Sequence, residues 1–169
     1  MTASLSTFVS LFGQQLATLD HLLGKGAAFA ASQGVSEAEM LGWRLVEDMQ
    51  PLSFQVQVVI NFATQWPARA AGLEIPADVA GDLDVAGYKA AIAKARDWIA
   101  AFPAGALEAR EDEPLTYEIG TGMVLTFPRG QWLTSFAATN LYFHLSTAYG
   151  ILRARGCPIG KADLFAGGI

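Results

Sequence analysis

Apolar side chains recur at intervals of three and four residues along four long segments of this chain. The first segment shows the pattern most clearly, from Leu5 through Val9 and Phe12 to Ala30. A helix completes a turn every 3.6 residues, so this spacing places the apolar side chains along one face. Four such faces predict four long helices that pack as one antiparallel bundle. We expect these helices near residues 4–32, 49–71, 84–102 and 131–155.

Two shorter elements are predicted between the long helices. Ser36 and Glu39 form a capping-box pattern for a short helix over residues 37–42. Residues at about 115–127 alternate apolar and polar side chains on either side of Gly120-Thr121-Gly122, which favours a β-hairpin. The expected fold class is therefore all-α, a four-helix bundle with a small hairpin between the third and fourth long helices.

Composition limits the kind of protein that this chain can be. Its 169 residues, 52% of them apolar, suffice for one core, so we expect a single domain over residues 1–169. The net charge of −5 disfavours nucleic acid and acidic membranes as partners. No stretch has the roughly 20 apolar residues of a membrane span, and no signal-peptide pattern is present. With Cys157 as the single cysteine, nothing indicates an oxidising compartment, and we expect a cytoplasmic protein.

Three polar side chains interrupt the apolar face of the fourth predicted helix. At about 100° of rotation per residue, Phe143, His144 and Thr147 all fall within about 60° of Asn140. Gln55 takes a similar inward position on the second predicted helix. An unpaired polar group in a core costs about 1–3 kcal/mol. We therefore expect Gln55, Asn140 and His144 to share hydrogen bonds in the bundle interior, directly or through water.

Two interpretations of these residues stay open. They could form a purely structural network, which is the commoner role of a lone histidine on an apolar face. They could instead line a polar pocket for a small molecule, with Thr147 and Asp48 as further candidates. Asp48 is more simply explained as the cap of the second long helix. Asp20 is the other carboxylate expected to face inward, and His21 is expected on the surface.

Three segments carry a resemblance to a known family. Residues 48–57 (DMQPLSFQVQ), 140–156 (NLYFHLSTAYGILRARG) and 160–165 (GKADLF) resemble an uncharacterised bacterial family, the domain of unknown function nineteen ninety-three. That family belongs to the DinB-like group of four-helix bundles, and the resemblance covers nearly the whole chain. It implies an up-down-down-up bundle and, as is common in the wider group, a homodimer, but it brings no established reaction.

The resemblance also raises the question of a metal. The wider group often holds one among three histidines, one on the second helix and two, four residues apart, on the fourth. Here the corresponding positions read as Gln55, Asn140 and His144. Because amide oxygens are weak ligands for zinc or nickel, we expect no tightly bound transition metal and no cofactor. This expectation holds unless Asp48 or Asp20 completes the ligand shell, and a weakly bound divalent metal near His144 also stays open.

Other catalytic patterns are missing from the sequence, including a Gly-rich phosphate loop, HExxH, CxxC and G-x-S-x-G. We therefore predict an uncharacterised DinB-like protein that binds a small molecule in a polar interior pocket. One alternative is a non-catalytic, dimeric structural or interaction protein. The other is a metal-dependent transferase or hydrolase of the DinB-like type, so whether the protein is an enzyme is left open.

Overall fold

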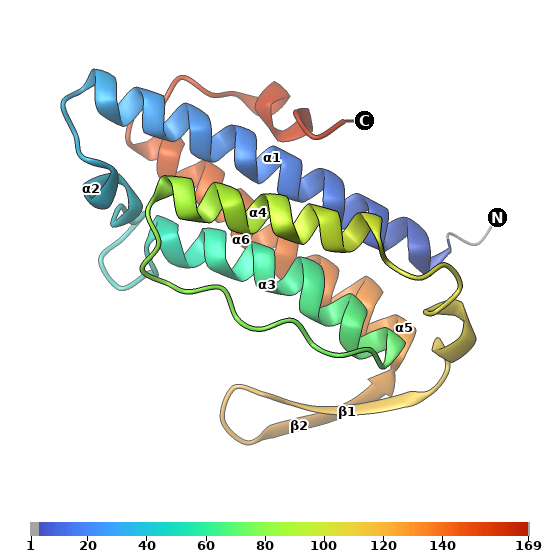
Figure 1. Cartoon of the computed structure of the whole chain (residues 1–169). Helices are drawn as coiled ribbons and strands as arrows, with labels where there is room; N and C mark the ends of the chain where they lie inside the picture. Colours follow the sequence, from blue (N-terminus) through green and yellow to red (C-terminus); the bar gives the residue numbers. More distant parts are fainter. Residues whose placement is uncertain (1–3, 169) are drawn as a thin grey trace.

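Four long helices form the body of the structure, a computed structural model that describes residues 4–168. They are α1 (Leu5–Ser32), α3 (Leu52–Ala71), α4 (Val85–Ala100) and α6 (Ala138–Ala154), and the short α2 (Glu37–Leu41) follows α1. The long helices lie side by side, and buried apolar side chains from all four form one core (Figure 1). The predicted all-α bundle is confirmed. None of the described helices is long and apolar enough to cross a membrane.

The four helices do not simply alternate in direction. α1 and α6 run one way and α3 and α4 run the other, because residues 72–84 return along the outside of the bundle before α4 begins (Figure 1). This is the up-down-down-up order that the resemblance implied. The antiparallel arrangement expected from the apolar faces was wrong for α3 and α4, since an apolar face looks the same whichever way its helix runs.

Polar side chains on the outer face of α3 hold this returning segment. The Asn61 amide accepts the N–H of Val79 at 3.0 Å and donates to Asp78 at 3.2 Å. One turn earlier, Gln57 donates to the Val79 carbonyl at 2.6 Å, and one turn later, Gln65 donates to Asp78 at 2.8 Å. The connection is therefore fixed along much of its length, which keeps α4 parallel to α3.

The helix starts follow cap residues that the sequence provides, with one exception. Ser36 and Asp84 accept backbone N–H groups three residues further on, at 3.2 and 2.7 Å. α3, however, begins at Leu52, with Pro51 as its N-cap residue and no side-chain cap. The prediction that Asp48 caps this helix was wrong. Residues 46–49 close a separate turn, which leaves Asp48 exposed in the loop before the helix.

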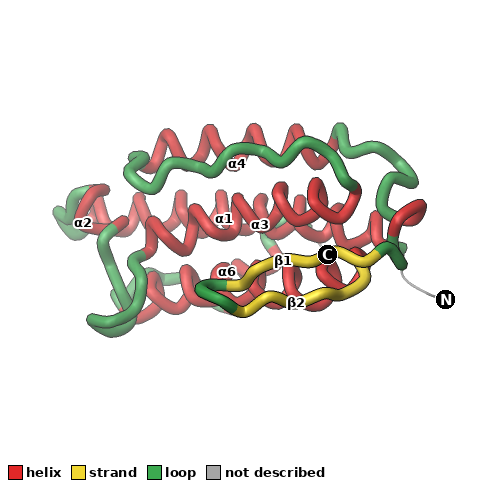
Figure 2. Tube along the Cα trace, turned by 90° about the horizontal axis from the view of Figure 1, so that it is seen from below, coloured by secondary structure: helices red, strands yellow, loops and turns green. Residues whose placement is uncertain are grey.

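The predicted hairpin is present as β1 (Pro114–Ile119) paired with β2 (Met123–Pro128). It lies against the outside of the bundle beside α6 (Figure 2), where the ring of Tyr117 packs on Trp66 of α3 with centroids 5.0 Å apart. The fourth helix is irregular at this point. The short α5 (Arg129–Gln131) continues into a π-helical segment, η2 (Trp132–Ala137), from which Trp132 donates its ring N–H to the Leu115 carbonyl at 2.7 Å.

The buried face of α6 is rotated relative to the prediction. Leu141, Leu145 and Ala148 are buried, whereas Phe143, which was expected to face inward, is 58% exposed. The apolar face is thus centred about 100° from Asn140 rather than on it. The polar residues of this helix consequently lie along the edge of the core and not at its centre.

The chain after α6 folds back over α1. Gly156 takes a φ of 91°, a left-handed value that suits glycine at a helix end. The following segment buries Cys157 and lays a 3₁₀ helix, η3 (Lys161–Phe165), against α1 (Figure 1). Leu164 of this segment packs against the core, while Phe165 is 48% exposed.

Candidate ligand site at His144

A hydrogen bond between Gln55 and His144 joins α3 to α6. Gln55 Oε1 lies 2.7 Å from His144 Nδ1, and the Gln55 side chain is buried. Gln55 Nε2 donates to the carbonyl of Gln50 at 3.1 Å. That second bond fixes the orientation of the amide, so Oε1 faces the imidazole and accepts from Nδ1–H. The contact that the two apolar faces predicted is therefore confirmed for this pair.

The same contact determines which nitrogen of the neutral His144 ring carries the proton. When Nδ1 carries the proton, the neutral ring keeps a lone pair on Nε2. Burial lowers the pKa of His144 below its usual value of 6.5, so the ring is neutral at pH 7. No described residue forms a hydrogen bond with Nε2, and Nε2 is not fully buried. Nε2 is therefore a free acceptor that keeps contact with solvent.

Three phenylalanine rings surround the imidazole. The centroids of Phe54, Phe62 and Phe143 lie 6.0, 6.4 and 5.1 Å from that of His144, and the first and last meet it edge to face. Apolar rings from both helices therefore lie next to the imidazole. None of the three phenylalanines was among the predicted site residues, which were chosen for their polar groups.

The other predicted site residues do not join this pair. The Asn140 amide donates to the Phe136 carbonyl at 2.8 Å, and the Thr147 hydroxyl donates to the Phe143 carbonyl at 2.7 Å. Both bonds reach one turn back along the same helix. We expected Asn140 to share hydrogen bonds with Gln55 and His144 directly or through water. No direct bond is present among the described contacts, because a carbonyl of its own helix is the nearer partner.

Two cavities on the described surface lie along α1, and neither is lined by Gln55, Asn140 or His144. The interior pocket predicted from the sequence is thus not among these cavities. What the structure describes at His144 is a partly exposed imidazole at the edge of the core, oriented by a buried amide.

The chain is similar to known proteins over nearly its whole length. A family model described as a domain of unknown function, DUF1993, matches residues 5–165. The chain belongs to the DUF1993 family. It is also similar to the crystal structure of a DinB family member protein from Shewanella denitrificans, with a TM-score of 0.82 and 28% identity over 92% of this chain and 88% of that one. No curated protein matches. This chain therefore has the DinB-like fold that the resemblance implied.

The donor set of this DUF1993 protein does not suit the three-histidine metal site of the wider DinB-like group. Gln55 Oε1 is already used by the imidazole N–H, and the Asn140 amide is held by its own helix. One imidazole nitrogen remains, which is too few strong donors for zinc or nickel. Across residues 4–168, no three His, Cys, Asp or Glu side chains gather in a way that could hold a metal.

Asp20 and Asp48, the two carboxylates considered as further metal ligands, lie elsewhere in the structure. Asp20, which was expected to face inward, forms an ion pair with Lys89 of α4 at 2.7 Å on the partly exposed side of α1. Asp48 stays in its exposed loop. His21 is half-exposed as expected, but it also contacts Asp163 of η3 at 2.7 Å, a partner that the sequence did not indicate.

Proposed function

We propose that this DUF1993 protein binds a small molecule through Nε2 of His144, without a transition metal. The observation that carries the proposal is the 2.7 Å bond from Nδ1 to Gln55, which makes Nε2 the acceptor of the ring and leaves it free. A matching ligand offers one O–H or N–H donor to Nε2 and an apolar body to the rings around it. A phenol is the simplest molecule with both features.

The experiment titrates phenol into ¹⁵N-labelled protein and records the imidazole nitrogens. We expect phenol to shift the Nε2 resonance of His144 and toluene, which lacks the donor, to leave it in place. His144→Phe keeps an aromatic ring but removes the acceptor, and it should abolish phenol binding, whereas His21→Phe should not. Equal phenol binding by wild type and His144→Phe would exclude this function.

We further propose that the protein is a homodimer that uses the outer face of α6. Tyr142 and Phe143 are 42% and 58% exposed there. Neighbouring exposed aromatic side chains are enriched at protein interfaces. Light scattering after size exclusion should therefore give the mass of two chains, and Phe143→Glu should give the mass of one. Phe165→Glu, at a comparably exposed aromatic residue of η3, is the matched control and should stay dimeric. A monomeric wild type would contradict the proposal.

A further inference from the structure

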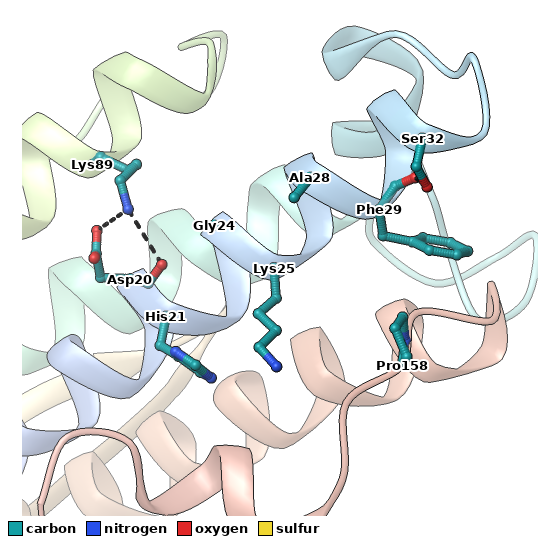
Figure 3. Close-up of a pocket in the computed structure, with 9 residues that line it drawn as sticks. All are labelled: Asp20, His21, Gly24, Lys25, Ala28, Phe29, Ser32, Lys89 and Pro158. Carbon is teal, nitrogen blue, oxygen red and sulfur yellow. Dashed lines mark hydrogen bonds and ion pairs between the residues drawn. The ribbon is translucent and has the colours of Figure 1, made fainter.

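A separate cavity lies on the outer side of α1, between α4 and the C-terminal segment (Figure 3). We call it the α1 groove. Its volume is about 600 Å³, and it is a shallow groove that is open to solvent. Gly24 and Ala28 lie one turn apart on the helix and leave space between the longer side chains on either side. A Cβ added to Gly24 would lie 3.7 Å from Lys89 Nζ, so a larger side chain there would enter the groove.

One ammonium group in the groove is incompletely paired. Lys89 has a close carboxylate, since Asp20 Oδ1 lies 2.7 Å from its Nζ. Lys25 reaches only Asp163 Oδ1, at 3.4 Å, among the described carboxylates. That oxygen already lies 2.7 Å from His21 Nε2, and the other oxygen of Asp163 accepts a backbone N–H at 2.7 Å. Lys25 thus shares Asp163 with closer partners, and its ammonium, with three N–H groups, keeps donors for a second acceptor.

The groove beside Lys25 is apolar. Phe29 follows Lys25 by one helical turn, about 6 Å along the axis, and Pro158 lines the groove from the C-terminal segment. Figure 3 places Lys25, Phe29 and Pro158 around the same side of α1. A molecule lying here would meet a positive charge at one end and apolar surface at the other.

We propose that the α1 groove binds a small monocarboxylate with an apolar body. Its carboxylate accepts from the Lys25 ammonium, and its body lies against Phe29 and Pro158. No arginine lines the groove among the described residues, and a phosphate would require several convergent donors. A single negative charge is therefore the better match. This site uses none of the residues proposed for ligand binding at His144.

The test titrates phenylacetate into the ¹⁵N-labelled full chain and follows the backbone amides. We expect saturable shifts at residues 24–29 of α1 and at Ile159. Lys25→Gln keeps a polar side chain, one atom shorter than lysine, but loses the charge, and it should weaken binding about tenfold, as expected for loss of a charge-assisted hydrogen bond. Lys94→Gln removes an exposed lysine of α4 outside the groove and should leave the affinity unchanged.

A second variant tests the cavity without altering the charges. Gly24→Leu fills the groove and should abolish the shifts in a protein whose circular dichroism shows an unchanged helical fold. The neutral analogue 2-phenylethanol and the short acetate ion should each bind at least about tenfold more weakly than phenylacetate. Shifts that do not saturate, that centre on other residues, or that weaken equally in Lys25→Gln and Lys94→Gln would overturn the proposal. The His144 resonances report on the other site independently.

Discussion

A single buried amide decides which nitrogen of His144 carries the proton. The Gln55 amide nitrogen donates to the Gln50 carbonyl at 3.1 Å, so the amide oxygen has a fixed direction toward Nδ1 of His144. Burial then keeps the ring neutral by lowering its pKa. The two effects together give an unprotonated Nε2 at pH 7, which is the chemical feature that any ligand of this site would use.

Replacing Gln55 by Glu should raise the pKa of His144. A carboxylate at the position of the amide oxygen, 2.7 Å from Nδ1, stabilises the imidazolium and opposes the effect of burial. NMR titration of the His144 ring measures the change. Gln50→Glu adds the same charge at an exposed position nearby and should have a much smaller effect. A pKa of His144 that is unchanged in Gln55→Glu would mean that the contact does not persist in solution.

The partner of Gln55 could be predicted from the sequence, whereas that of Asn140 could not. Helical angles give the direction of each Cβ, and a glutamine is long enough to reach a neighbouring helix. The shorter Asn140 and Thr147 side chains find a carbonyl on their own helix first, which angles do not reveal. Phe143 was misplaced because the face was centred on a polar residue instead of on Leu141, Leu145 and Ala148.

At the scale of elements, the polar face of α3 explains the direction of α4, which the apolar faces do not determine. The four helices and the hairpin could be predicted because their periodicities are local. The parallel course of α3 and α4 depends on Gln57, Asn61 and Gln65, which follow one another at intervals of one turn and bind the segment around Val79. Their spacing is visible in the sequence, but their partners are 11 to 22 residues away.

Replacing Asn61 by Ala should loosen the connection between α3 and α4. The change removes both the acceptor for the Val79 N–H and the donor to Asp78, so we expect the free energy of unfolding to fall by about 1–3 kcal/mol. Urea denaturation measures the loss, and hydrogen exchange of the Val79 amide should become faster. Ser146→Ala, at an exposed position of α6, should change stability by less than about 0.5 kcal/mol. Unaltered exchange at Val79 would refute this role.

At the scale of the whole molecule, contacts between residues distant in sequence close the end of the bundle. Glu108, in the 3₁₀ helix η1 (Glu108–Arg110) between α4 and the hairpin, accepts from the Ser4 and Ser6 hydroxyls at 2.7 Å each and from the Ser6 N–H at 3.0 Å. Its negative charge faces the N-terminus of α1, where the helix dipole favours an anion. Because these partners are more than 100 residues apart, no local pattern in the sequence predicts the contact.

The stabilising effect of Glu108 should depend on pH with a definite sign. Hydrogen bonds from the side chain of Ser4 and then from Ser6 lower the pKa of Glu108 from 4.5 to about 2. A carboxyl whose pKa is lower in the folded state stabilises that state above the unfolded pKa and loses this effect as the pH falls toward the folded one. The free energy of unfolding of wild type should therefore exceed that of Glu108→Gln at pH 7, and the difference should shrink between pH 4.5 and about 2. Urea denaturation of both proteins across this range measures it, with Glu111→Gln as the exposed control. A difference that stays constant with pH would show that the charge of Glu108 contributes nothing and that any effect comes from neutral hydrogen bonds.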